Sequence, residues 1–142
     1  MSKKNEISVD ALVSKISEEL TGYQRHVVDT AMVDVTARAM AELVDKTKAT
    51  APVGKRTKHY RDNITSKVLR KRDLGYGVTY RELWYVKGSD YRLSHLLNNG
   101  HALRNGGRYV GTKFITKATD EVETAYLENL KHAIEQGGYT DW

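Results

Sequence analysis

The first third of the chain carries a helical pattern of apolar residues. Apolar side chains recur at spacings of three and four from Val9 to Val44, which is the period of one face of an α-helix. Ser8 precedes the pattern and is suited to cap its first turn. Pro52 ends the region, because proline disfavours helical geometry at the residue before it. The pattern therefore predicts helix from Ser8 to about Thr50.

One unbroken helix of this length is too long for a small compact domain. It would measure about 60 Å, whereas a compact domain of this chain length has a radius of gyration of about 14–15 Å. Either the helix breaks near Thr21-Gly22, where glycine weakens a helix interior, or one end projects and packs on something else. We expect residues 1–20 to form an amphipathic arm whose apolar face meets a neighbouring subunit.

A β-hairpin is expected after the helix. Residues 64–71 and 76–86 are rich in β-branched and aromatic residues, and turn residues 73–75 separate them. In the second stretch, Val78 and Tyr80 share one parity whereas Leu83 and Tyr85 have the other. This shift indicates a bulge in the second strand, or an earlier end of that strand.

The last part of the chain predicts two helices around a glycine-rich loop. The pattern indicates a short helix over residues 92–98, a loop over 100–111, a strand or an anchor at Phe114-Ile115, and a helix over 117–136 that Gly137-Gly138 ends. The expected fold class is α+β, with the last helix packed on the sheet. Residues 21–136 form the single expected domain, and residues 137–142 a short tail.

The composition excludes several classes of protein. Hydrophobic residues make up 39% of the chain and charged residues 29%, as in soluble globular proteins. No apolar run reaches the length of a membrane span, and the start of the chain lacks the apolar stretch of a secretory signal. The absence of cysteine excludes disulfide scaffolds, thiol catalysis and cysteine zinc sites. These features predict a protein that is made in the cytoplasm and has no membrane partner.

Positive charge is concentrated in one part of the sequence. The net charge is +5, but residues 46–72 hold ten Lys and Arg against one acid, Asp62, and so carry +9. Residues 92–117 form a weaker basic region, with five Lys and Arg and no acid. This asymmetry indicates a polyanionic or acidic partner, either nucleic acid or the acidic face of another protein. A solvated basic surface is the alternative interpretation.

The candidate catalytic motifs do not hold. Residues 106–113 have the glycine spacing of a phosphate-binding loop, but Thr112 stands where the lysine must follow the second glycine. His95 and His101 are the two closest histidines, and no carboxylate between Asp90 and Asp120 completes a metal site. No serine lies in a nucleophile-elbow context. The sequence therefore predicts no enzyme, no metal and no cofactor.

A basic loop over residues 53–63 is the first candidate contact site. Its candidate residues are Lys55, Arg56, Lys58, His59, Tyr60 and Arg61. The cations are suited to contact phosphates, and Tyr60 to stack on a base. The segment has no recognition helix, so sequence-specific readout is not expected. Non-specific contact with DNA and contact with an acidic protein ring both remain open.

Three stretches of the chain carry a family resemblance. They are residues 48–52, residues 54–60 with Asn63-Ile64, and above all residues 91–108. These stretches resemble the small neck and tail-completion proteins of long-tailed bacteriophages, over about residues 8–136. The resemblance marks a second set of candidate residues: Tyr91, Arg92, His95, Gly100, His101, Arg104, Gly106, Gly107 and Arg108. The chain departs from the family in lacking a Thr-Gly pair after Pro52 and prolines around residues 113–118.

The resemblance implies a structural role in a virion. It implies an α+β subunit that forms a homo-oligomeric ring at the head–tail junction, completes the tail and joins it to the DNA-filled head, without catalysis. On this interpretation residues 8–20 and 53–63 contact neighbouring subunits or the adjacent neck and tail proteins. The loop at 100–111 packs under the hairpin or lines an interface. The alternative is a small basic DNA-binding accessory protein in which the +9 segment grips phosphates.

Overall fold

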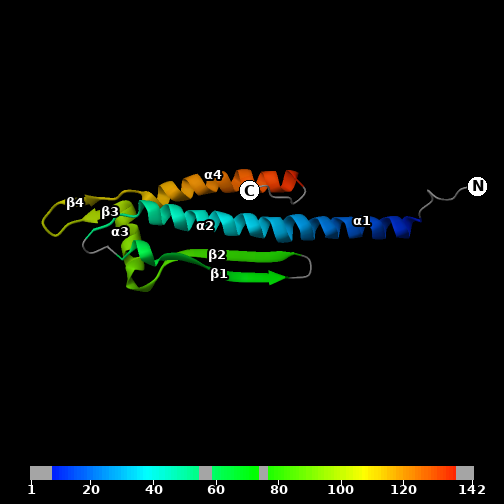
Figure 1. The fold of residues 1–142 in the computed structure, drawn as a ribbon, viewed down its shortest axis with the longest axis horizontal. Helices are drawn as coiled ribbons and strands as arrows, with labels where there is room; N and C mark the ends of the chain where they lie inside the picture. The colour runs from blue at the N-terminus through cyan, green and yellow to red at the C-terminus, as the bar shows by residue number, and fades with distance from the viewer. Residues whose placement is uncertain (1–7, 55–58, 74–76, 137–142) are drawn as a thin grey trace, which may run out of the picture.

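The computed structural model describes residues 8–54, 59–73 and 77–136 (Figure 1). A long helical rod runs through the middle, with a β-hairpin on one side and the C-terminal helix on the other. The fold class is α+β, as predicted from the sequence. Part of the basic loop (55–58), the turn residues Leu74-Gly75, the Gly137-Gly138 helix stop and the tail lie outside the described residues.

The rod is helical from Val9 to Thr50 without a break. It consists of α1 (Val9–Tyr23), a π-helical segment (Gln24–Met32) and α2 (Val33–Thr50). The Ser8 hydroxyl caps α1 by accepting a hydrogen bond from the backbone N–H of Ala11 at 3.1 Å. Gly22 does not break the helix, because its cost of about 1 kcal/mol is small beside the propensity of its neighbours. Of the two predicted alternatives the structure has the second, in which α1 projects beyond the rest of the molecule (Figure 1).

The hairpin pairs β1 (Ile64–Asp73) with β2 (Val78–Val86) in antiparallel register. The register shifts between Val68 and Arg70, so the extra residue lies in β1. The predicted bulge exists, but its expected position in the second strand was wrong. The inner face of the hairpin meets α2, where the Trp84 indole N–H donates to the Thr47 hydroxyl at 3.0 Å.

The inner face of the hairpin also contains a phenol with a raised pKa. Tyr80 donates its hydroxyl proton to the Glu82 carboxylate at 2.8 Å. Burial, followed by the hydrogen bond and charge of Glu82, raises the pKa of Tyr80 to about 12. Because this pKa lies above the ordinary value of 10.0, the protonated Tyr80 phenol stabilises the folded protein below pH 10. This stabilisation is lost as the pH rises through about 12.

The titration of Tyr80 is therefore a testable property of the fold. The tyrosinate absorbance of Tyr80 is the part that the Tyr80→Phe variant lacks, and we expect it to develop near pH 12. In a Glu82→Gln variant we expect this absorbance to develop at a lower pH. The measurement is a difference titration of the wild-type protein against Tyr80→Phe. A Tyr80 component that titrates at its ordinary pKa in the folded protein would contradict this packing.

A compact junction follows the hairpin. A 3₁₀ turn (Gly88–Leu93) leads into α3 (Ser94–Asn99), and a small hairpin of β3 (Gly100–Ala102) and β4 (Arg108–Val110) lies where the sequence predicts only a loop. A second 3₁₀ turn, Arg61–Asn63, precedes β1. The last helix, α4, spans Phe114–Glu135 and begins earlier than predicted. Phe114 is thus an anchor at a helix start and not part of a strand.

Two hydrophobic clusters hold these layers together. The larger one joins the end of α2, the loop after it, the base of the hairpin, α3 and the start of α4; its buried residues are Ala51, Tyr60, Ile64, Val86, Leu97 and Phe114. The smaller one joins the rod to the end of α4 through Ala31, Val35 and Ala133. The small buried alanines allow the two helices to approach closely.

The position of α4 corrects one detail of the expected fold. Only the first turn of α4 reaches the base of the hairpin, through Phe114 and Ile115. The rest of α4 lies along α2, which separates it from the sheet (Figure 1). The physical reason is that α2 is apolar on two sides. Val35 faces the cluster with α4, and Val44 packs toward the hairpin base.

Candidate contact surfaces

Within the described part of the basic loop, Tyr60 points into the protein, whereas His59 and Asp62 are exposed. Tyr60 is 0% exposed, and its hydroxyl donates to the Ser94 hydroxyl at 2.8 Å. Its ring meets Phe114 edge to face, with 6.1 Å between the ring centroids. Burial raises the pKa of the Tyr60 phenol above its ordinary value. Stacking of Tyr60 on a base, expected from the sequence, is therefore corrected, because Tyr60 is a core residue.

The two sequence neighbours of Tyr60 differ in their surroundings, because Arg61 contacts the protein and His59 is exposed. The Arg61 guanidinium donates to the backbone carbonyl of Ala51 at 3.3 Å, which ties the loop to the end of α2. His59 is exposed. The other three candidates in this loop, Lys55, Arg56 and Lys58, lie outside the described residues.

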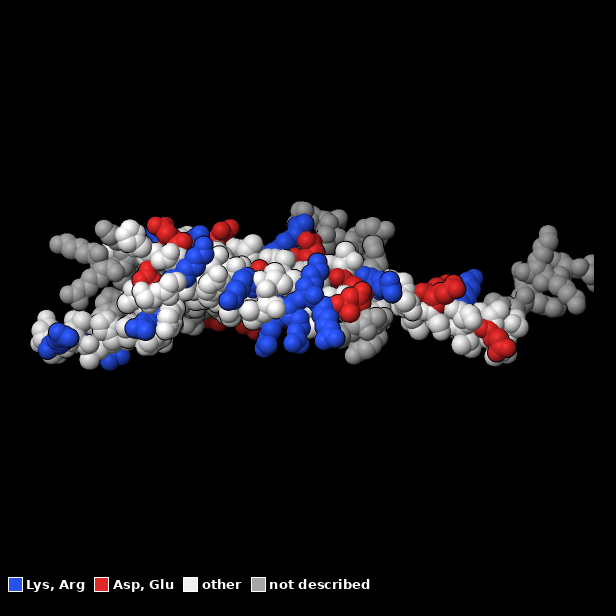
Figure 2. Space-filling model, turned by 90° about the horizontal axis from the view of Figure 1, so that it is seen from below, with Lys and Arg blue, Asp and Glu red and all other residues white. Residues whose placement is uncertain are grey.

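Three described basic residues of the +9 segment, Lys67, Arg70 and Arg72, lie on one face of the hairpin, whereas Lys71 has the opposite parity. Side chains alternate across a strand, and the hydrogen bond from Trp84 to Thr47 of α2 shows that the parity of Trp84 faces the rod. The opposite surface, here called the outer hairpin face, presents Lys67, Arg70, Arg72, Arg81, Leu83 and Tyr85. The two acids of the described hairpin, Asp73 and Glu82, have the inner parity. Figure 2, viewed from the hairpin side, shows Lys and Arg gathered along this part of the molecule.

The cations of the outer hairpin face are crowded. Arg70 and Arg81 are direct cross-strand partners, and like charges in that arrangement are destabilising. The Lys67 ammonium lies 4.9 Å from the centroid of the Tyr85 ring. This surface therefore favours an anionic group that approaches from outside.

The stretch that carries the resemblance, residues 91–108, contains a residue that caps α4. Lys113, the residue before α4, has a left-handed backbone (φ 57°), and its side chain does not cap the helix. Asn98 caps it instead from α3, because its Oδ1 accepts from the backbone N–H groups of Ile115 and Thr116 at 3.1 and 3.2 Å. Sequence reasoning missed this role. The available signal was a polar residue directly after the apolar pair Leu96-Leu97.

Glycines of the same stretch permit a close backbone crossing. Gly100 has φ +85°, and a side chain there would collide with the backbone carbonyl of Tyr109. A side chain on Gly111 would collide with the backbone of Asn98 and Gly100. Gly106, with φ +87°, forms the turn between β3 and β4. The fold thus explains two of the marked glycines, Gly100 and Gly106. It also explains Gly111, which the resemblance does not mark.

The other marked residues lie mainly on the surface. The exposed ones are Tyr91, Arg92, His95, Arg104, Gly107 and Arg108. The Arg92 guanidinium stacks on the Tyr91 ring at 5.7 Å from its centroid. His101 is half-buried and packs on Tyr109 with 5.4 Å between ring centroids. The structure therefore brings these residues to one end of the molecule, around α3 and the β3–β4 hairpin.

The projecting helix α1 exposes an apolar stripe. The stripe consists of Val9, Leu12, Val13, Ile16, Leu20 and Tyr23, all of them exposed, and Val9 reaches 76%. No residue of α1 is buried. Large apolar side chains arranged in one line are typical of a surface that another chain covers.

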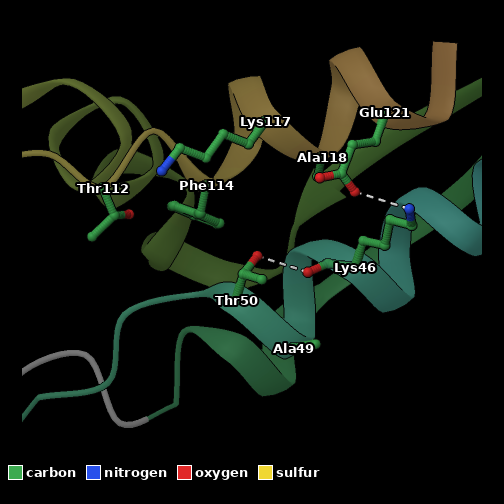
Figure 3. A pocket seen from close by; sticks show the side chains of 8 residues that line it. All are labelled: Lys46, Ala49, Thr50, Thr112, Phe114, Lys117, Ala118 and Glu121. Carbon is green, nitrogen blue, oxygen red and sulfur yellow. Dashed lines mark hydrogen bonds and ion pairs between the residues drawn. The ribbon is translucent and has the colours of Figure 1, made fainter. Parts of the chain in front are cut away.

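Two hollows lie along the contact between α2 and α4. One, of about 360 Å³, lies beside Phe114, and the Lys46–Glu121 ion pair (3.0 Å) crosses its wall (Figure 3). The other, of about 300 Å³, is an apolar groove lined chiefly by Ala39, Met40, Leu43, Val122 and Tyr126. Within the described ranges no three His, Asp or Glu side chains are grouped to hold a metal ion. None of the helices in that part of the chain has the length and apolar character to cross a membrane.

These surfaces are typical of a protein that contacts other macromolecules. They are an apolar helix stripe, a basic sheet face and an exposed loop end. The model of the HK97-gp10-like family, described as "Bacteriophage HK97-gp10, putative tail-component", matches residues 14–100. The chain belongs to this family, and its role is that of a structural component of a phage tail, located in the virion and in contact with other tail or neck proteins. No curated protein and no solved structure matches the chain.

Proposed function

We propose that the chain is a non-enzymatic ring subunit at the head–tail interface of a tailed phage. Copies of the chain assemble into a closed ring that completes the tail and joins it to the DNA-filled head. The observation that carries this proposal is α1, which projects from the domain and exposes its whole apolar stripe. Membership of a tail-component family supports the setting.

Association of copies follows from the shape of the subunit. Burial of apolar surface contributes about 25 cal/mol per Å², so a contact that covers the α1 stripe stabilises an assembly. The stripe lies at one end of the molecule, and no matching stripe lies beside it among the described residues. Pairing of two α1 stripes would bring together two helices that each carry a net charge of −2, so a heterologous contact with a different surface is favoured, and such contacts close into rings when the rotation allows it.

Two further groups of residues are proposed to meet the adjacent neck and tail proteins. These are the loop residues Lys55, Arg56, Lys58 and His59, together with the exposed end around α3 that carries Tyr91, Arg92, His95, Arg104 and Arg108. Both groups are rich in cations, so their partners are expected to be acidic proteins.

Deletion of the gene in the phage or prophage that encodes the chain tests the proposed function. We expect lysates with filled heads and separate tails, and few joined particles, in electron micrographs. Supply of the wild-type protein from a plasmid is expected to restore joined virions. Normal yields of joined, infectious particles without the protein would contradict the proposal.

A second candidate function, non-specific DNA binding, is favoured by the outer hairpin face. Each phosphate contact contributes about 0.9 to the slope of log affinity against log salt. If the four cations of that face contact phosphates, their joint replacement by alanine is expected to reduce the slope by about 3–4. The control carries Arg104→Ala and Arg108→Ala on the β3–β4 hairpin. No measurable affinity of the wild-type protein for DNA at near-physiological salt would exclude this function.

A further inference from the structure

We propose that α1 of one copy covers the outer hairpin face of the next copy. This inference rests on the proposed ring and names the interface that builds it. The occupant is a second copy of this chain, and the surface that receives it consists of Lys67, Arg70, Arg72, Arg81, Leu83 and Tyr85.

The first argument is that the hairpin lacks a layer. A two-stranded sheet is marginally stable on its own, and it needs packing against another element. Here the base of the inner face packs on α2 through Trp84 and Thr47, whereas Leu83 on the outer face is 41% exposed. A helix laid on a sheet is one of the few common ways to bury an open sheet face.

The second argument is charge complementarity. Helix α1 carries Asp10, Glu18 and Glu19 against Lys15, a net charge of −2. The outer hairpin face carries four cations and none of the acids of the described hairpin. Acidic side chains that flank the α1 stripe would relieve the repulsion between Arg70 and Arg81.

The third argument is fit. Helix α1 has 15 residues and is about 22 Å long. The strands of 9–10 residues provide a platform of about 30 Å. Helix α1 is therefore short enough for its whole stripe to fit along the strands of the hairpin.

The covering helix comes from another copy. The rod is continuous from α1 to α2, and α2 occupies the inner side of its own hairpin. Helix α1 consequently extends away from the hairpin of the same chain (Figure 1). The contact is head-to-tail, as the proposed ring requires.

The groove between α2 and α4 is the competing receptor. Its lining includes Met40, Leu43 and Val122, and is apolar, but its charged residue is Glu123. An acidic helix would meet a like charge there, whereas it meets four cations on the hairpin. Charge therefore favours the hairpin as the receptor.

Disulfide trapping between full-length copies tests the contact directly, because the natural chain has no cysteine. A Val13→Cys chain is mixed with a Leu83→Cys chain and oxidised. We expect a mixed disulfide dimer at a yield at least tenfold above that with a Thr124→Cys chain. Thr124 is exposed on α4. Ile16→Cys in place of Val13→Cys covers an alternative alignment of the helix on the strands.

Charge reversal provides the second arm of the test. Arg70→Glu with Arg81→Glu in the hairpin copy is expected to reduce trapping at least tenfold. Asp10→Lys with Glu19→Lys in the arm copy is expected to restore it. This recovery distinguishes a specific contact from loss of folding in the hairpin variant.

The outcomes separate the contact from the proposed function. Absence of trapping at Leu83, equal trapping at Thr124, or stronger trapping at Met40→Cys in the groove would each overturn the contact. If the hairpin cations prove to bind DNA and no disulfide forms, the face belongs to nucleic acid, and the contact is also overturned. Closed rings observed together with any of these results would leave the proposed function standing.

Discussion

Replacement of Phe114 by alanine is expected to lower the free energy of unfolding by about 3–5 kcal/mol. Phe114 is 2% exposed and lies at the centre of the larger hydrophobic cluster, against Tyr60 and beside Ile64 and Leu97. Its removal opens a cavity where the start of α4, the loop, the hairpin base and α3 meet. Urea unfolding followed by circular dichroism measures the loss.

The matched control for Phe114 lies on the same helix. Leu127 is 57% exposed, and Leu127→Ala is expected to change the free energy of unfolding by no more than about 0.5 kcal/mol. Equal losses for the two variants would contradict the assignment of Phe114 as the anchor of α4.

Replacement of Asn98 by alanine is expected to cost about 2–4 kcal/mol of stability. The variant loses the acceptor for the backbone N–H groups of Ile115 and Thr116, and also the donor to the Thr116 hydroxyl at 3.1 Å. The two backbone N–H groups at the start of α4 then lack this acceptor. Unfolding in urea and helical content from circular dichroism measure the effect.

The adjacent Asn99 is the control for Asn98. Asn99 is exposed, and its side chain accepts from the Lys113 ammonium at 2.8 Å. We expect Asn99→Ala to lose less than about 1 kcal/mol, because water replaces an exposed partner. If Asn99→Ala proves as destabilising as Asn98→Ala, the cap across the two helices is not the reason that Asn98 matters.

The elements with a clear period were predictable from the sequence. The apolar stripe of the rod, the β-rich stretches of the hairpin and the pattern of α4 each depend on local spacing, and the structure confirms all three. The α+β class follows from them. The bulge was assigned to the wrong strand because Leu83 and Tyr85 belong to the outer face of a regular β2, so their change of parity marks apolar residues on that face and not an extra residue.

The features that the sequence did not predict depend on contacts between distant residues. Tyr60 resembles a surface aromatic among cations, and only the approach of Ser94 and Phe114 makes it a core residue. The cap from Asn98 spans 17 residues to Ile115. Local patterns contain neither contact.

The candidate contact surfaces were predictable in part. The concentration of cations in residues 46–72 was visible in the sequence, but which of them share the outer hairpin face depends on the register that places Arg70 opposite Arg81. The arm was also predicted, and the choice between a break and a projecting end depended on whether the helix propensity around Gly22 outweighed its cost.

Native mass spectrometry of the purified full-length chain over a concentration series tests the central claim most directly. Negative-stain images of any large species accompany it. We predict closed rings with one fixed copy number that form as the concentration rises. A monomer at every concentration, or open chains of variable length, would contradict the account.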